Sequence, residues 1–234
     1  MNKLKSLLIN TKLYHYLSYL KNHKRKLKRN EYFRAEGTHL LQLFASTLNH
    51  HNIPFWLDYG TLLGFYRDHD FISHDFDLDF GTKMDYSEDI RRILISAGFK
   101  LIKEYHVDDS MGLEECYKFG HTTLDVFYYQ PTSNDNEISC YSFRHFNRVK
   151  NRDVGKKVPV GVQEVINPFI GLSKVRFKDS DIFVPQNTEE YLIANYGKDY
   201  MIPNPKFNWM KDATNIKIFT YEEKPGWALF YEVI

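Results

Sequence analysis

Apolar residues recur at helical spacing in several segments of the chain. Within residues 36–50 they form one stripe, which predicts a helix and consists of Leu40, Leu41, Phe44 and Leu48. Helices are also predicted for 87–98 and 188–197, because each segment begins with a hydroxyl residue that can cap it and ends at a glycine. A further helix is expected within residues 4–20, where leucines recur at roughly helical spacing.

Alternating and short apolar segments predict strands between these helices. In residues 71–80 every second position from 75 onward is an aspartate, and the positions between are apolar, as in a strand with one buried face. Residues 53–59 and 122–129 are also expected to form strands. This mixture of helices and strands predicts an α+β (mixed α/β) fold around a small mixed sheet.

Charge is distributed unevenly along the chain. Residues 1–30 hold nine of the 31 Lys and Arg residues and no acidic residue, whereas the remainder holds all 30 acidic residues. We therefore expect a basic N-terminal helical arm (1–30) and one further domain (31–234). The arm is either a solvated helix followed by a charged linker or a basic amphipathic element that contacts an anionic membrane. A nucleic-acid partner is not expected, because the rest of the chain is acidic and lacks a basic aromatic stripe.

Cysteine content and hydropathy bear on the compartment. The two cysteines, Cys116 and Cys140, are too few for a disulfide framework or a cysteine-rich zinc site. Polar residues interrupt the N-terminal apolar run at positions 10–12, so no signal peptide is expected. No stretch approaches the roughly 20 apolar residues of a membrane span. We expect a cytoplasmic protein, and a lipid-binding arm would place it peripherally at the inner face of the plasma membrane.

Three aspartates on one face of a strand repel one another. Asp75, Asp77 and Asp79 would follow each other at about 6.6 Å, from a rise of about 3.3 Å per residue. Such a row must be solvated, protonated or neutralised by a cation, and oxygen ligands favour Mg²⁺ or Mn²⁺. Asp77 and Asp79 are therefore predicted metal ligands, and Asp125 on a separate strand is the candidate third. Asp75 is predicted to be a metal ligand, a residue that supports the ligands without touching the metal, or a base. The simpler alternative for the whole row is a solvated acidic strand.

A glycine-led turn precedes the acidic strand. Gly60 follows a predicted strand, and Thr61 begins a helical turn that contains Gly64 and Arg67. Free backbone N–H groups at a helix start bind phosphate, and glycine lets a ligand approach the backbone. The glycines and Thr61 are therefore predicted to contact phosphate. Arg67 either contacts a phosphate oxygen or pairs with a nearby aspartate.

These motifs resemble those of the LicD/fukutin family, which belongs to the nucleotidyltransferase-fold superfamily. The superfamily pattern is a glycine with a small hydroxyl residue, an Asp-x-Asp strand and a later aspartate, matched here by Gly60-Thr61, Asp77-Leu78-Asp79 and Asp125. The family's closing pattern is matched by Phe183-Val184-Pro185, Tyr191-Leu192, Asn195-Tyr196-Gly197 and Pro203. The resemblance covers about residues 36–205 and implies a nucleotidyltransferase-like small mixed sheet flanked by helices. Ser73-His74 departs from it, because the family often has Pro-Trp before its aspartates.

The resemblance implies an enzyme that transfers a phosphorylated alcohol. Family members take phosphocholine, ribitol phosphate or glycerol phosphate from a CDP-activated donor and attach it to a sugar hydroxyl. We therefore expect a Mg²⁺-dependent phosphotransferase that acts on a glycan or lipid-linked sugar of the capsule, lipopolysaccharide or teichoic-acid type. Asp77, Asp79, Asp125 and Asp75 would be its catalytic residues, with Asp125 or Asp75 as base. Two alternatives stay open: a nucleotidyltransferase that moves NMP from an NTP to a hydroxyl, and a non-catalytic scaffold on the same fold.

Overall fold

Eleven strands and five α-helices make up the part of the chain that the structure describes. The computed structural model describes residues 12–107, 112–146 and 153–232. The strands are β1 (Phe55–Leu57), β2 (Asp77–Lys83), β3 (Lys100–Val107), β4 (Gly112–Phe119), β5 (Thr122–Pro131), β6 (Glu137–His145), β7 (Lys157–Pro168), β8 (Leu172–Phe177), β9 (Ser180–Pro185), β10 (Ile216–Ile218) and β11 (Gly226–Phe230). The helices are α2 (Lys12–His50), α3 (Tyr59–Leu63), α4 (Ser87–Ser96), α5 (Thr188–Tyr196) and α6 (Trp209–Asp212), with a π-helical turn η1 (Gly64–Asp68) and a 3-10 turn η2 (Met84–Tyr86).

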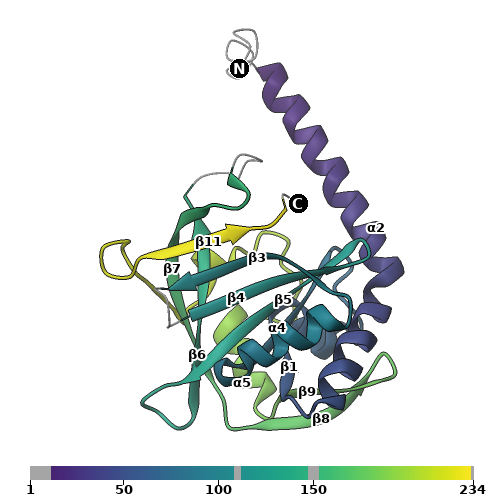
Figure 1. Cartoon of the computed structure of the whole chain (residues 1–234), viewed down its shortest axis with the longest axis vertical. Coiled ribbons are helices and arrows are strands. Elements are labelled where there is room, and N and C mark those ends of the chain that lie inside the picture. The colour runs from purple at the N-terminus through teal and green to yellow at the C-terminus, as the bar shows by residue number, and fades with distance from the viewer. Residues whose placement is uncertain (1–11, 108–111, 147–152, 233–234) are drawn as a thin grey trace.

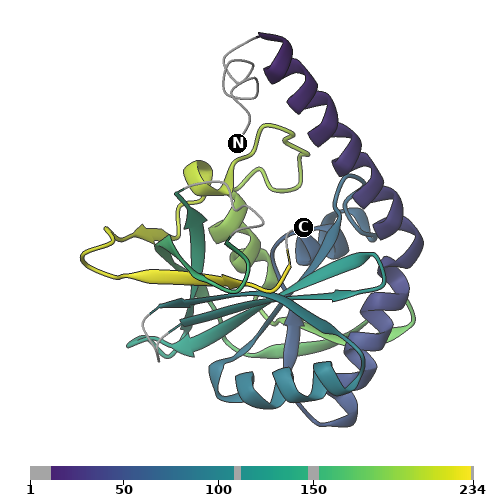
Figure 2. The same cartoon turned by 45° about the horizontal axis from the view of Figure 1, so that its top comes forward.

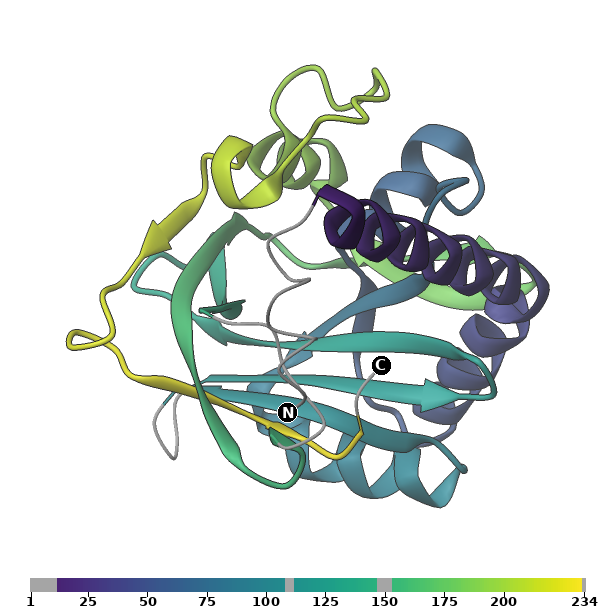
Figure 3. The same ribbon diagram turned by 90° about the horizontal axis from the view of Figure 1, so that it is seen from above.

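Six antiparallel strands close into a barrel (Figure 1). Around the ring the order is β5-β4-β3-β11-β7-β6, and β6 returns to pair with β5. Outside the ring, β2 joins β5 in parallel and β1 pairs with β2, while β10 pairs with β7. Seen from above, β7 bends strongly around the ring, and the hairpin of β8 and β9 lies apart from it (Figure 3).

This architecture shows that the predicted fold class is wrong. The sequence predicts an α+β (mixed α/β) fold, a nucleotidyltransferase-like small mixed sheet flanked by helices, but the structure has a closed antiparallel barrel with few helices. The prediction fails because β3 and β4 carry charged residues at positions that become buried. Glu104, Glu114 and Glu115 are all buried, so the apolar alternation that marks a strand is broken in this part of the sequence.

Two helices cover one face of the sheet. α2 and α4 contact each other and pack over β2, β3 and β5, and α4 lies beneath the strands in Figure 2. Phe44 of α2 stacks on Phe80 of β2 with ring centroids 3.9 Å apart and meets Phe55 edge-on at 5.4 Å. Leu124 of β5 lies in the same core. The face of β2 and β5 that meets the helices is therefore apolar, which leaves their opposite face for polar side chains.

Helix α2 runs without a break from Lys12 to His50. The basic run 21–29, for which a charged linker was one interpretation, is helical throughout. The N-terminal part of α2 stands away from the strands, whereas its C-terminal part packs on them (Figures 1 and 2). Its projecting part exposes four large apolar side chains, Tyr16, Leu17, Tyr19 and Leu27. None of the helices in the described part of the chain is long and apolar enough to cross a membrane.

Several predicted elements are confirmed. The helices predicted for 87–98 and 188–197 are α4 and α5, and the strand predicted for 122–129 is β5. The strand predicted for 71–80 is shorter than expected, because β2 begins only at position 77. The N–H group of Asp75 instead closes a turn with the carbonyl oxygen three residues earlier, at 3.0 Å. The three alternating aspartates therefore do not all lie on one strand.

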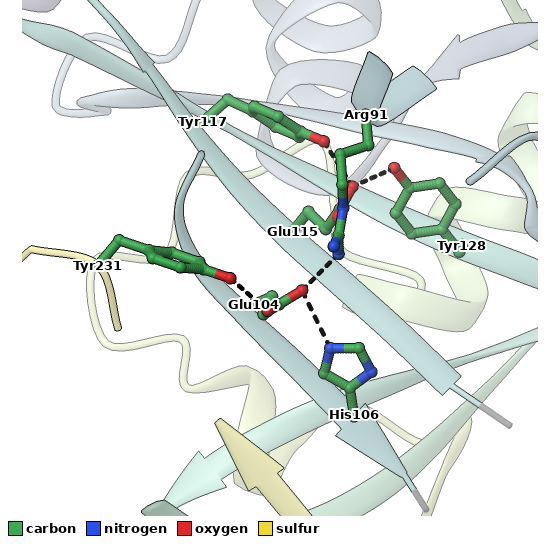
Figure 4. A network of polar contacts seen from close by, with 7 residues as sticks. All are labelled: Arg91, Glu104, His106, Glu115, Tyr117, Tyr128 and Tyr231. Atoms are coloured by element: carbon green, nitrogen blue, oxygen red, sulfur yellow. Dashed lines mark hydrogen bonds and ion pairs between the residues drawn. The ribbon is translucent and has the colours of Figure 1, made fainter. Parts of the chain in front are cut away.

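A polar network joins α4 to the sheet (Figure 4). Arg91 of α4 forms ion pairs with Glu104 of β3 and Glu115 of β4. The hydroxyl of Tyr117 donates to Glu115 at 2.6 Å, and that of Tyr231 donates to Glu104 at 2.7 Å. Both carboxylates are thus satisfied by specific partners, which is the condition for burying them.

Candidate active site

The predicted carboxylates of β2 and β5 lie on the face of the sheet opposite the helices. Leu78 and Phe80 of β2 belong to the helix-covered core, so strand alternation places Asp77 and Asp79 on the other face. β2 and β5 run in parallel, and Asp79 lies directly opposite Asp125 in their register. The sheet therefore brings together three of the four aspartates proposed from the sequence.

The turn after β1 holds Asp79 through three hydrogen bonds. The N–H group of Gly60 donates to Asp79 Oδ2 at 3.1 Å, the Asp79 N–H donates to Thr61 Oγ1 at 2.8 Å, and the Asp58 N–H donates to the Asp79 carbonyl at 3.0 Å. A Cβ atom at position 60 would lie 3.1 Å from Asp75 Oδ2 and 3.3 Å from Asp79 Oδ2. Glycine thus lets the turn approach both carboxylates. The contact of Gly60 and Thr61 with phosphate remains a prediction.

A buried carboxyl group supports this turn from behind. Asp58 is 0% exposed and accepts hydrogen bonds from the hydroxyls of Tyr129 at 2.7 Å and Tyr191 at 2.9 Å, and from the Tyr59 N–H at 2.9 Å. Burial raises the pKa of Asp58 to about 6, although these hydrogen bonds act against the shift. Tyr59 has a φ angle of 35°, which residues other than glycine rarely adopt. The contacts of Asp58 therefore hold a strained backbone next to Gly60.

Three aspartates at the site, Asp75, Asp77 and Asp79, are harder to ionise than ordinary aspartates. Burial, followed by the charge of Asp125, raises the pKa of Asp77 to about 7. Burial and the charges of Asp77 and Asp125 raise the pKa of Asp79 well above its usual range, and burial raises the pKa of Asp75 to about 6. A bound cation would favour the ionised forms and remove this penalty. The cluster therefore has the electrostatic character of a cation site.

Two basic side chains that the sequence pattern did not single out lie beside the cluster. Arg29 Nη2 is 3.6 Å from Asp77 Oδ2, and its guanidinium group lies 4.1 Å from the ring centroid of Phe76. Lys103 Nζ is 3.7 Å from Asp125 Oδ1. Arg29 is one of six Lys and Arg residues within 21–29, and Lys103 belongs to a strand that alternation does not reveal. No local signal therefore distinguished either residue.

The arrangement suits a metal ion that also binds water and phosphate. Among the residues that the structure describes, no three or more His, Cys, Asp or Glu side chains are grouped so as to hold a metal ion by themselves. Mg²⁺, however, commonly takes only one or two carboxylates and completes its shell with water and substrate oxygens. Asp125 Oδ1 is buried without a hydrogen-bond partner, so it offers such an oxygen. Mg²⁺ or Mn²⁺ stays a prediction, with Asp77, Asp79 and Asp125 as its candidate ligands.

The other residues proposed from the sequence have structural contacts of their own. The carbonyl of Asp75 accepts a 2.6 Å hydrogen bond from the side chain of Asn30 on α2. Arg67 pairs with Asp68 through two bonds of 2.7 and 2.8 Å, which is the alternative that its context left open. A Cβ atom on Gly64 would lie 2.7 Å from a backbone oxygen, so this glycine allows two chain segments to approach closely. Their contacts with a nucleotide remain predictions.

A cavity of about 340 Å³ opens beside Asp79 and Asp125. Most of its wall is aromatic and consists of Tyr59, Phe127, Phe143, Tyr196, Phe207 and Trp209. Glu114 and Ser142 add polar groups to this wall. Burial raises the pKa of Glu114 to about 8 against the opposing charge of Lys103. A concave, largely apolar pocket with a few polar groups is the usual form of a small-molecule site.

The sequence that contains the candidate site is similar to those of known proteins. The family model described as "LicD/FKTN/FKRP, nucleotidyltransferase domain" matches residues 52–187, which contain Gly60 and the four aspartates. Three proteins named "Ribitol-5-phosphate transferase FKTN" match over 187 residues, or 79% of this chain, with 33% identity in Homo sapiens and Macaca fascicularis and 32% in Mus musculus. The match covers 37% of the length of each of these relatives. The chain therefore belongs to the LicD/FKTN/FKRP family.

Proposed function

We propose that this chain is a metal-dependent transferase that moves a phosphorylated alcohol from a CDP-activated donor to a sugar hydroxyl of a glycan. The observation that carries the proposal is the pairing of Asp79 with Asp125, beside Asp77 and at one end of a cavity. Ribitol phosphate is the first candidate among the three alcohols, because the mammalian relatives are named ribitol-5-phosphate transferases. Phosphocholine and glycerol phosphate are the other two.

In the proposed reaction, the oxygen of the acceptor hydroxyl attacks the phosphorus atom that carries the alcohol. The bond from this phosphorus to the bridging oxygen breaks, and CMP leaves. Mg²⁺ or Mn²⁺ on Asp77, Asp79 and Asp125 would neutralise the charge that develops on the diphosphate. Asp75 or Asp125 takes the proton of the hydroxyl. Arg29 and Lys103 border the cluster and supply positive charge for phosphate oxygens.

The released nucleotide distinguishes this function from its two alternatives. The protein is incubated with Mg²⁺, a panel of glycan acceptors and CDP-ribitol, CDP-glycerol, CDP-choline or CTP, and the products are separated by chromatography. We expect CMP from one CDP-alcohol together with a phosphorylated acceptor. Diphosphate from CTP would indicate NMP transfer instead. A protein that binds neither metal nor nucleotide would be a scaffold on the same fold.

We also propose that the projecting part of α2 contacts an anionic membrane, at the cytoplasmic face where a lipid-linked acceptor would be available. With 3.6 residues per turn, one side of this helix carries Tyr16, Leu20 and Leu27, and the adjacent side carries Lys21, Lys24 and Lys28. Apolar residues beside cations, with no acidic residue in positions 1–30, are typical of helices that lie on anionic lipid. An acceptor of the capsule, lipopolysaccharide or teichoic-acid type belongs to the same proposal.

A further inference from the structure

The cavity beside the carboxylates has two kinds of wall. One part of the lining is formed by the neighbouring residues Gly60, Asp79 and Asp125, which are the groups assigned to phosphate and metal. The other walls are aromatic and come from separate parts of the fold: α3, β5, β6, α5 and the segment around α6. A ligand that fills this cavity therefore has a charged end and a flat, apolar end.

Five of the six aromatic side chains that line the cavity are held by contacts outside it or with each other. Tyr59 and Phe127 meet edge-on with centroids 4.7 Å apart, and Tyr196 lies 5.2 Å from Phe207. Phe143 stacks on Tyr105 inside the barrel at 5.2 Å. These contacts fix the rings before any ligand binds. Rings fixed in this way lose little conformational entropy when they stack on a ligand.

Two polar groups face this aromatic space. Ser142 is 4% exposed, and its hydroxyl has no hydrogen-bond partner in the described part of the chain. The carboxyl group of Glu114 is also buried and lines the same cavity. A buried hydroxyl without a partner is unfavourable and is normally explained by a missing water or ligand. The flat end of the ligand should therefore carry hydrogen-bonding atoms on its edge.

We propose that this cavity binds the pyrimidine base of the donor nucleotide, with the aromatic rings against its faces and Ser142 and Glu114 at its polar edge. The inference rests on the proposed function and adds to it the place of the base. A cavity of about 340 Å³ is at the small end for ligand sites, so it holds part of the donor and not all of it. With the base inside, the diphosphate lies at Asp79 and Asp125. The alcohol then lies outside, on the side of Asp77 and Arg29, neither of which lines the cavity.

Binding of CMP to the full chain, measured by isothermal titration calorimetry, tests the inference directly. Phosphocholine and ribitol 5-phosphate serve as comparison ligands that lack a base. Trp209 is 41% exposed and can be replaced without disturbing a core. We expect Trp209→Ala to weaken CMP binding by about tenfold or more, because a base that stacks on an aromatic ring gains much of its affinity from that contact. Tyr221→Ala, at 43% exposure and outside the cavity lining, is the matched control and should bind CMP as the wild type does.

A second pair of variants tests the polar edge. Ser142→Ala should weaken CMP binding several-fold, whereas Ser139→Ala on the same strand should not, because Ser139 is buried but does not line the cavity. The inference is overturned if wild type fails to bind CMP, if neither cavity variant changes its affinity, or if these variants lower the affinity for phosphocholine instead. If the cavity variants bind CMP as the wild type does, and the wild type releases CMP from a CDP-alcohol, the base site is removed and the proposed function stands. If the cavity variants weaken CMP binding but the chain transfers no phosphorylated alcohol, the base site stands and the proposed function is removed.

Discussion

At the scale of single residues, the carboxylates of the site are half-buried, and their negative charges are only partly balanced by nearby cations. Asp79 forms no ion pair among the residues that the structure describes, and Asp77 and Asp125 have their cations at 3.6 and 3.7 Å, beyond hydrogen-bonding distance. The raised pKa values of Asp77 and Asp79 report the cost of ionising these two residues in this environment. A ligand that binds only the folded protein and favours these ionised forms should therefore stabilise it.

Replacing Asp77 with Asn should stabilise the metal-free protein near neutral pH. The folded state holds protons on Asp77 up to about pH 7 and on Asp75 up to about pH 6, whereas the unfolded chain releases them near pH 4. Stability of the metal-free wild type therefore falls as pH rises from about 4 to 7. Asp77→Asn removes one such group, so its stability should fall less over this window. At pH 8 its Tm should be higher by about 2–4 °C for each kcal/mol of relief.

Scanning calorimetry in EDTA from pH 4.5 to pH 8 measures this difference. Asp85→Asn is the control, because Asp85 is exposed and lies just beyond the same strand. It should follow the wild-type curve. A variant at position 77 that is less stable than wild type throughout, or a wild type that gains stability over the window, would contradict the electrostatic account.

At the scale of elements, the arm formed by the projecting part of α2 gives a separate prediction. Wild-type protein should co-sediment with vesicles that contain phosphatidylserine and remain in solution with vesicles of phosphatidylcholine alone. Changing Lys21, Lys24 and Lys28 to Glu should abolish sedimentation, since each cation near an anionic surface contributes about 1 kcal/mol. These side chains are exposed and lie outside the site, so the barrel should stay folded.

The control for the arm changes three exposed lysines on other elements, Lys83, Lys100 and Lys156, to Glu. This variant has the same net charge as the arm variant and should still bind the vesicles. Equal loss of binding in both variants would show an effect of net charge alone. Binding that survives the changes in the arm would remove α2 as the membrane contact.

The elements that the sequence predicted correctly have one apolar face or residues typical of a helix boundary, although, within the residues described, neither Ser87 nor Thr188 forms a capping hydrogen bond. Helix α4 and strand β5 follow from local periodicity and helix α5 from its boundary residues, so no distant contact is needed to recognise them. Strands β3 and β4 did not show such a pattern, because Glu104 and Glu115 are buried through ion pairs with Arg91 that form only in the fold. Closure of the barrel depends on β11 pairing with β3, and a pairing so distant in sequence has no local signal.

The site was predictable to the extent that its residues lie on predictable elements. The faces of Asp77, Asp79 and Asp125 follow from their apolar neighbours, and the structure places Asp79 opposite Asp125. Asp75 was assigned to the same strand but lies in the preceding turn, because β2 is shorter than its alternation suggests. The aromatic cavity could not be anticipated, since its walls come from elements separated by more than 100 residues.

At the scale of the whole molecule, one continuous helix links the proposed membrane contact to the proposed active site. The arm is the N-terminal part of α2, and two residues further along the same helix touch the acidic segment: Arg29 beside Asp77 and Asn30 on the carbonyl of Asp75. The strands provide the other walls of the site. An arm that lies on a membrane would therefore set the orientation of the site toward an acceptor in that membrane.

The central claim is that Asp79 and Asp125 form a metal-dependent site for a CDP-alcohol. The most direct measurement is the rate of CMP release from the CDP-alcohol that the product assay identifies, with Mg²⁺ and with EDTA, for wild type, Asp79→Asn, Asp125→Asn and the control Asp85→Asn. We expect wild type and control to lose activity in EDTA and to regain it with Mg²⁺. Both site variants should be slower by about 100-fold or more, because a metal contributes several kcal/mol of charge stabilisation. CMP release that needs no metal, or a full rate in either site variant, would contradict it.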